Sequence, residues 1–222
     1  MAIAKIPENE AERLDALRRY EILDTLEDQA YDDLTKLATS IAGTPIALIS
    51  LVDEDRLWFK SKVGLNASQM PREHTFCSHA ITSPAVENRD LFIVGDAQED
   101  ARFADNFVVL NDPKIRFYAA AMLITPDHFP LGTLCVIDRQ PRQLTEAQLA
   151  ALNALGRQVI TQLELRRSAT DLKQALLTVE ERTSQLTAAE KKYRSIFENA
   201  TEGIFQISLD GHVAGPDQSR EH

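Results

Sequence analysis

The sequence predicts an α+β fold in which helices cover an antiparallel sheet and a long helix follows. Two observations support the globular part: strand-length apolar runs are separated by turn residues, and two early segments repeat apolar residues at helical spacing. The third observation is a stretch without glycine or proline from 157 to 199, which predicts the long helix.

Two helices are expected before the first strand. Asn9 can cap a helix that ends near Tyr20. A second helix is expected over 28–42, because its apolar residues fall on one stripe and Gly43 follows as a stop signal.

Five strands and one short helix follow. The run 46–52 is apolar throughout, which suits a strand buried on both faces. The region 64–73 is rich in polar and turn residues and is expected to be a loop. Thr75 can cap a short helix over 76–82, and 102–109 has the pattern of a helical turn. The other expected strands are 57–63, 91–94, 115–124 and 131–137.

The long helix is expected from Thr145 to Asn199, a length of roughly 80 Å at 1.5 Å per residue. A row at alternating spacings of four and three has the pattern of a coiled-coil seam, so we expect a second copy of the chain to cover it. Thr183 and Glu190 are its two weak positions. The row consists of Leu165, Ala169, Leu172, Leu176, Val179, Thr183, Leu186, Glu190, Tyr193 and Phe197.

Three segments are therefore predicted: a globular domain over 1–166, a coiled-coil helix over 167–192 and the truncated start of another domain over 193–222. In the last segment, apolar residues alternate over 204–209 and the turn Asp210-Gly211 follows, as in a first hairpin.

Composition restricts the partners. The 222 residues carry 24 Lys and Arg against 34 Asp and Glu, and a net charge of −10 argues against sequence-independent binding to nucleic acid. Two cysteines form no disulfide framework, and the N-terminus lacks the apolar block of a signal peptide. No apolar run is long enough to span a bilayer, so we expect a cytoplasmic chain with no membrane segment.

Six blocks of the sequence carry a family resemblance: Glu12 to Thr25, Ala47 to Leu65, Pro71 to Ile81, Asp100 to Phe103, Ile115 to Leu123 and Leu131 to Arg142. In this order they resemble the GAF domains of bacterial sensor histidine kinases and cyclic-dinucleotide enzymes. The stretch from Lys191 to Gly211 is similar to the opening of a PAS domain. The GAF resemblance implies a six-stranded antiparallel sheet with helices on one face, a ligand cleft on the other, and parallel dimers through the terminal helices.

Eight residues are candidates for a ligand site in that cleft, although each also has a structural interpretation. Aromatic residues are often core, and arginines that could hold an anion are often paired with carboxylates. Asp53, Asp96 and Asp138 each follow a strand and are expected to bond turn backbone. The candidates are Trp58, Arg72, Cys77, His79, Arg102, Phe103, Arg116 and Tyr118.

The cluster His74, Cys77 and His79 has ligand types that suit a metal ion, but on a short helix Cys77 and His79 point about 200° apart. We therefore expect no metal site there, and the cofactor is unknown. Cys77 precedes Ser78 where bilin-binding relatives commonly have a histidine, which disfavours a pigment. A methionine sulfoxide reductase of this fold would need more cysteines than Cys77 and Cys135.

The predicted function is a regulatory input module that binds a small ligand or a partner. Its state would pass through the dimeric helix to a downstream effector, such as a histidine kinase or a cyclic-dinucleotide enzyme. Two alternatives remain: a ligand-free dimerisation module, and a cysteine-dependent enzyme of the sulfoxide reductase type. No catalytic residues are assigned, because the sequence contains no nucleophile-base set and no phosphate-binding glycine loop.

Overall fold

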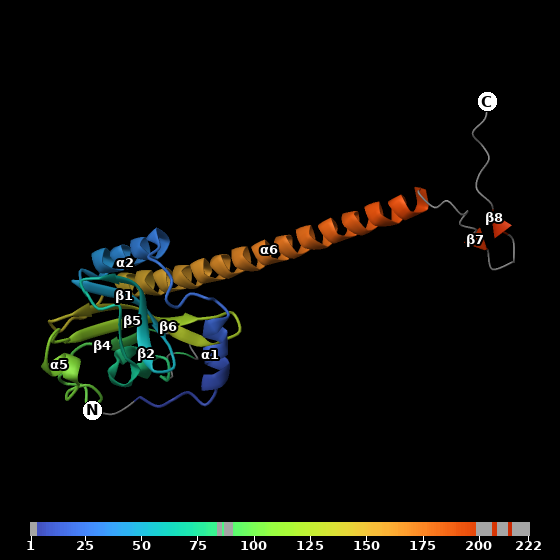
Figure 1. Ribbon diagram of the computed structural model, residues 1–222. Coiled ribbons are helices and arrows are strands. Elements are labelled where there is room, and N and C mark those ends of the chain that lie inside the picture. Colours follow the sequence, from blue (N-terminus) through green and yellow to red (C-terminus); the bar gives the residue numbers. More distant parts are fainter. Residues whose placement is uncertain (1–3, 84–85, 87–90, 199–205, 208–212, 215–222) are drawn as a thin grey trace. The chain divides into compact units, whose positions relative to one another are not determined.

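The structure is a computed structural model that describes residues 4–83, 86, 91–198, 206–207 and 213–214 (Figure 1). It divides into two compact units, Met1–Ser168 and Ala169–His222. Among the described residues, no helix is both long enough and apolar enough to cross a membrane.

The first unit contains a six-stranded antiparallel sheet in the order β3-β2-β1-β6-β5-β4 (Figure 1). This confirms the predicted α+β class with a long C-terminal helix. The edge strand β3 lies where a loop was expected, because three residues that include a proline give no strand pattern. The strands are β1 (Ile46–Val52), β2 (Arg56–Val63), β3 (Gln69–Pro71), β4 (Leu91–Val94), β5 (Phe117–Ile124) and β6 (Pro130–Asp138).

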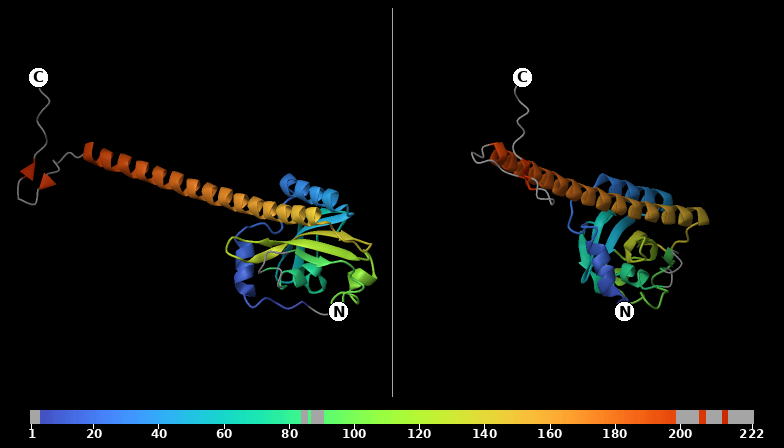
Figure 2. Two further views of the ribbon diagram at one scale, coloured as in Figure 1. Left: turned by 180° about the vertical axis from the view of Figure 1, so that it is seen from behind. Right: turned by 90° about the vertical axis from the view of Figure 1, so that its right-hand side faces the viewer.

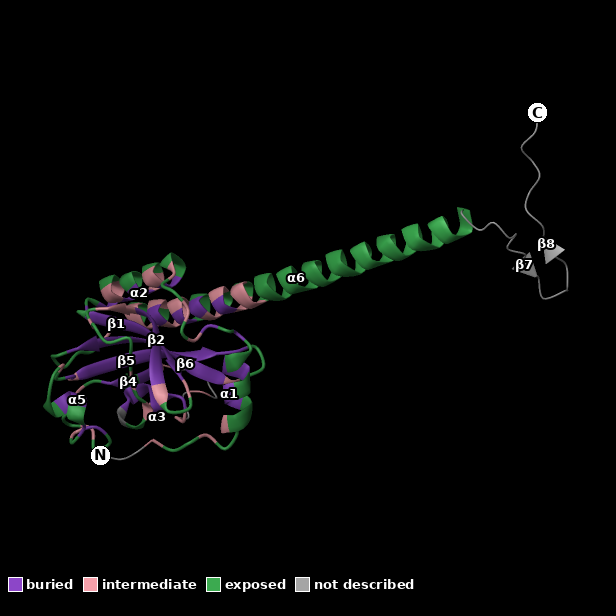
Figure 3. Cartoon of the chain, in the orientation of Figure 1, coloured by how far each residue is buried: buried purple, intermediate pink, exposed green. Residues whose placement is uncertain are grey.

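Helices cover both faces of this sheet (Figures 1 and 2). On one face, α1 (Glu10–Arg18), α2 (Gln29–Ala42) and the first turns of α6 (Glu146–Glu198) bury apolar side chains against the strands. On the other, α3 (Phe76–Ala80) and α5 (Phe107–Leu110) cover a second core, and the short helix η1 (Arg72–His74) precedes α3. The strands β1, β5 and β6 are buried along their whole length, so the sheet is the middle layer (Figure 3).

The predicted signals at Gly43 and Thr75 end and begin helices as expected, and Asp28 adds an N-cap that was not predicted. Asp28 accepts a hydrogen bond from the Ala30 N–H at 3.0 Å, and Gly43 takes the left-handed conformation with φ of 65°. Thr75 accepts from the Ser78 N–H at 3.2 Å. Asn9 stands at the N-cap of α1, but its side chain makes no capping bond.

Two glycines allow close approach between elements. A Cβ on Gly132 would lie 1.9 Å from the Ser50 carbonyl oxygen, so β6 can pair with β1 there only because residue 132 has no side chain. On α6, Gly156 makes a similar approach to β5. Together they let the sheet and its covering helix pack at short range.

The second unit is described from Ala169 to Glu198 on α6 and over β7 (Gln206–Ile207) and β8 (Val213–Ala214). The α6 residues of this unit are exposed (Figure 3), and β7 pairs with β8 in antiparallel fashion. Most of the predicted third segment, 193–222, lies outside the described residues.

Candidate functional site

Five of the predicted site residues gather beneath α3, in the core opposite α2. Cys77 and His79 lie on α3, Phe103 follows β4, and Tyr118 lies on β5. Arg102 adjoins Phe103 and reaches over its ring. We call Phe76, Cys77, Phe103, Tyr118 and Thr133 the Cys77 cluster, because their side chains are in contact.

Aromatic rings fill the centre of this cluster. The Phe76 ring stacks on Phe103, with centroids 4.1 Å apart, and on Tyr118 at 4.9 Å. Phe103 is fully buried and Tyr118 is 1% exposed. Stacking at these separations leaves no room between the rings. The face that was expected to hold a cleft is therefore packed at this place.

Cys77 has polar partners inside the apolar core. Its sulfur lies 3.2 Å from the Tyr118 hydroxyl, and the Thr133 hydroxyl donates to it at 3.3 Å. Hydrogen bonding with Cys135 lowers the pKa of Cys77 to about 7, against the opposing effect of burial. Burial raises the pKa of Cys135. Although its pKa is low, Cys77 is only 3% exposed, which separates it from a substrate.

His79 and Arg102 lie at the edge of the cluster. The His79 ring meets the Phe103 ring edge to face, with centroids 4.9 Å apart. Arg102 lies 5.0 Å from the centroid of the Phe92 ring and holds Asp100 through bonds of 2.6 and 2.9 Å. Among the described residues, no group of three His, Cys, Asp or Glu could bind a metal ion.

The other two arginines are also paired with carboxylates. Arg72 binds Glu10 at 2.5 Å and donates to the Asp53 carbonyl oxygen at 3.0 Å. Arg116 binds Asp96, with one bond of 2.7 Å. The three candidate arginines therefore contact three different carboxylates. This arrangement fits the structural interpretation that the sequence left open, not a shared anion site.

The three aspartates that follow strands bond turn backbone as predicted. Asp53, Asp96 and Asp138 accept from the N–H groups of Glu54, Gln98 and Gln140, at distances of 2.9 to 3.1 Å. These bonds fix the strand ends that surround the site.

Trp58 lies away from the Cys77 cluster. It belongs to the core on the α2 side of the sheet and is 7% exposed, whereas its neighbour Phe59 faces the other core. Phe117 and Tyr118 divide between the two cores in the same way, as alternation along a strand requires.

The exposed face of α6 forms the second candidate site. We call the ten residues at alternating four and three spacing from Leu165 to Phe197 the α6 row. Its large apolar members are each more than half exposed, from 55% at Leu176 to 73% at Tyr193. Glu190 makes an ion pair of 2.9 Å with Arg194 on the same helix. A row of this kind matches the contact face of a coiled coil.

The earlier part of α6 is fixed to the sheet domain. Leu152, Gly156, Val159 and Leu163 are buried at four and three spacing. The Tyr20 hydroxyl donates to Glu164, and the Arg167 guanidinium lies 5.5 Å from the Tyr20 ring centroid. One helix thus carries both a buried row and an exposed apolar row.

Comparison with known proteins gives matches over the sheet domain. The model of a family described as GAF domain matches residues 27–163. A cyclic di-GMP phosphodiesterase from Pseudomonas aeruginosa is 41% identical over 169 residues, which make up 76% of this chain and 28% of that protein. The chain therefore spans little more than a quarter of that relative.

Solved structures show the same fold at low identity. The blue-light absorbing form of the PixJ GAF domain from Thermosynechococcus elongatus aligns with a TM-score of 0.50 and 12% identity, over 80% of this chain and 98% of that one. A structure of the cyanobacteriochrome receptor PixJ gives a TM-score of 0.50 and 14% identity, over 68% of this chain and 97% of that one.

Proposed function

The chain belongs to the GAF domain family, and we propose that it is the regulatory input module of a signalling protein. In this proposal the sheet domain changes state on binding a small molecule or a partner. α6 carries the change, paired with α6 of a second copy along the α6 row. A downstream domain then supplies the output.

The observation that carries this proposal is the double role of α6. A single helix of 53 residues buries Leu152, Val159 and Leu163 against the sheet and then exposes the apolar α6 row. A displacement at the buried end has a continuous helical path to the exposed end. Exposed apolar side chains at heptad spacing favour association with a like helix.

The relative from Pseudomonas aeruginosa favours a cyclic-dinucleotide enzyme over a histidine kinase as the output. Its name describes a phosphodiesterase that acts on cyclic di-GMP. We extend that output to the parent of this chain as part of the proposal. The test is to assay the parent protein for hydrolysis of cyclic di-GMP, with and without the sheet domain.

The stacked Cys77 cluster favours a second candidate function, a ligand-free dimerisation module. Phe76, Phe103 and Tyr118 occupy the face where the family resemblance places a ligand cleft. In that case the sheet domain would serve only to hold two α6 helices side by side. Both candidates require the dimer, so the dimer is tested first.

The dimer test is light scattering of the chain at micromolar concentration. We expect a mass near twice the 24.8 kDa of one chain. Leu172→Glu places a charge in the α6 row and should shift the mass toward that of one chain. Leu177→Glu is the matched control, since Leu177 is also exposed but lies outside the row.

A mass of 24.8 kDa for the unchanged chain would contradict the proposal. Equal effects of the two substitutions would also contradict it, because the row would then have no special part in association. Circular dichroism of both variants shows whether the sheet domain and helix remain folded.

A further inference from the structure

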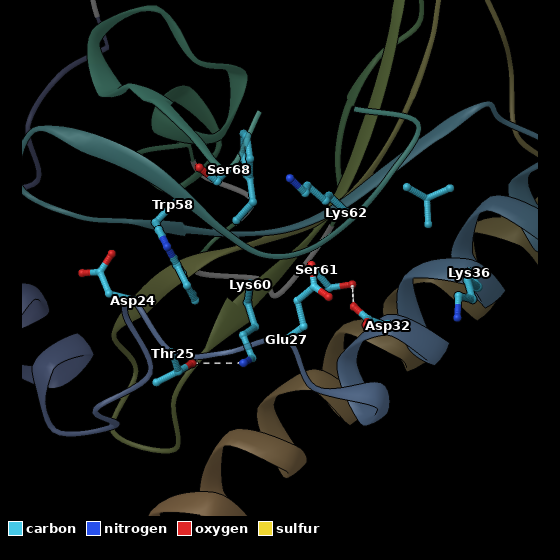
Figure 4. A pocket seen from close by; sticks show the side chains of 12 residues that line it. Asp24, Thr25, Glu27, Asp32, Lys36, Trp58, Lys60, Ser61, Lys62 and Ser68 are labelled. Carbon is cyan, nitrogen blue, oxygen red and sulfur yellow. Dashed lines mark hydrogen bonds between the residues drawn. The ribbon is translucent and has the colours of Figure 1, made fainter. Parts of the chain in front are cut away.

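A pocket of about 510 Å³ lies between β2, α2 and the segment that joins α1 to α2 (Figure 4). No residue of the Cys77 cluster lines this pocket, so the two sites are separate. Its size is that of pockets that bind small molecules, roughly 300 to 1,000 Å³.

A β-bulge aims a lysine toward this pocket. On β1, Ile49 pairs with Ser61 and the next residue, Ser50, pairs with Phe59. Lys60 is therefore the extra residue, and its side chain turns toward the segment before α2. Bulges commonly redirect one side chain in this way and occur next to functional sites.

Lys60 is buried and is held by neutral groups. It is 4% exposed, and its ammonium donates to the Leu26 carbonyl oxygen at 2.6 Å and to the Thr25 hydroxyl at 3.0 Å (Figure 4). Lys62 lies on the other face of β2, because it pairs with Leu48 of the second core, and it donates to the carbonyl oxygens of Asn66 and Ala67. Lys60 has no carboxylate within 4.0 Å in the described part of the chain and feels the charges of Asp28 and Asp32 only at longer range, so an anionic ligand would supply a direct counter-charge.

Carboxylates line the opposite side of the pocket. Asp32 on α2 accepts a hydrogen bond from Ser61 at 2.6 Å, and Glu27 is exposed in the segment before α2 (Figure 4). Asp24 is already bound by Arg56 through two bonds. In all, three lysines and three carboxylates line the pocket, and such a balance suits a ligand that carries both charges.

We propose that this pocket binds a small dipolar metabolite that carries both a carboxylate and an ammonium group, as α-amino acids do. The ligand carboxylate contacts Lys60, and its ammonium contacts Asp32 and Glu27. This inference rests on the proposed sensory function and deepens it by naming the ligand class and its location.

The pocket also adjoins α6 through Tyr31. The Lys60 ammonium lies 5.2 Å from the centroid of the Tyr31 ring, whose hydroxyl is buried without a hydrogen-bond partner among the described residues. Burial raises the pKa of Tyr31 to about 12, with the Asp28 charge acting in the same direction and the charge of Arg166 on α6 opposing it. A ligand that engages Lys60 therefore alters the charge beside Tyr31 and α6.

Isothermal titration calorimetry of the whole chain tests the proposal, with each of the standard amino acids as a probe. We expect at least one to bind more tightly than about 1 mM. Its amine, which lacks the carboxylate, and its hydroxy acid, which lacks the ammonium, should each bind about tenfold more weakly or worse.

Variants place the binding in this pocket. Lys60→Met and Asp32→Asn should each weaken binding by about tenfold or more, whereas Lys114→Met, an exposed lysine outside the pocket, should leave it unchanged. If Lys60→Met does not fold, Glu27→Gln takes its place, because it alters a charge at the pocket without removing a bond to the segment before α2.

Three results would overturn the inference: no binding by any amino acid, equal binding of the hydroxy acid, or binding that none of the pocket variants weakens. Light scattering without ligand reports on the dimer separately. A chain that is dimeric and binds no amino acid contradicts this inference alone, whereas a monomeric chain contradicts the proposed function.

Discussion

Gly156 of α6 lies directly over Ala121 of β5: a Cβ on Gly156 would come within 2.7 Å of the Ala121 Cβ. Real side chains do not approach so closely, so any larger residue at 156 must push α6 away from the sheet. The contact fixes the height of the helix over the domain.

Gly156→Val should therefore destabilise the sheet domain by about 1 to 3 kcal/mol, the usual cost of overpacking. Urea unfolding followed by circular dichroism measures this change. Ala121→Gly in the same chain should restore part of the loss, because it removes the methyl group that clashes. Gly95→Val is a control at a position where an added Cβ has only ordinary contacts. Equal losses at 156 and 95 would show that the close approach is not the cause.

Glu190→Leu should strengthen the dimer. Glu190 occupies the α6 row, where a charged side chain in a coiled-coil seam is costly and leucine packs well. We expect the dissociation constant to fall by about tenfold or more, measured by sedimentation equilibrium. Glu181→Leu is the matched control, because residue 181 lies on the face of the same helix opposite the α6 row. A similar increase in dimer affinity from Glu181→Leu would indicate nonspecific hydrophobic association rather than packing along the α6 row.

Acid should weaken the contact between α1 and the segment after β3. Burial opposes ionisation of Glu10, but hydrogen bonds and charges from Arg13 and Arg72 outweigh it and lower the pKa of Glu10 below its ordinary 4.5. The resulting stability is fully present above pH 4.5 and is lost as the pH falls through the folded-state pKa.

Glu10→Gln should consequently lower the melting temperature at pH 7 and flatten its fall below pH 4.5. Thermal melts from pH 7 to pH 3 follow both effects, and Glu12→Gln, an exposed glutamate on the same helix, serves as control. An unchanged acid profile in Glu10→Gln would remove this carboxylate as the cause.

Both thiols should resist chemical labelling in the folded chain. Cys77 is 3% exposed and Cys135 is fully buried, so a disulfide reagent cannot reach either sulfur despite the low pKa of Cys77. Titration with a chromogenic disulfide should give almost no fast reaction in buffer and two equivalents in denaturant. Fast reaction of one equivalent in buffer would instead support the alternative function, a cysteine-dependent enzyme of the sulfoxide reductase type.

Local patterns explain why the elements could be predicted from the sequence. The cap at Thr75 and the stop at Gly43 depend on neighbours within a few residues, and the structure places both as expected. The strands were also predictable, because full burial leaves an almost continuous apolar run. The edge strand β3, which buries little, had no such signal.

The site could be predicted only in part, since it depends on contacts between distant residues. Arg72 pairs with Glu10 and Arg116 pairs with Asp96. Each partner lies in a different part of the chain, so no sequence spacing reveals the pair. The bulge at Lys60 is set by pairing with β1, so the pocket beside it was missed. The sequence signal that could have drawn attention to it is a lysine between Phe59 and Ser61 in an otherwise buried strand.

The buried row on α6 and the exposed α6 row face different sides of the helix. Continued at the same spacing, Leu152, Gly156, Val159 and Leu163 would be followed by Arg166 and Thr170, whereas the α6 row has Leu165 and Ala169. The two rows are therefore one residue out of phase, which is about 100° around a helix. A helix with such an offset can transmit rotation as well as displacement along its axis, and inserting one residue between Leu163 and Leu165 would bring the two rows into phase.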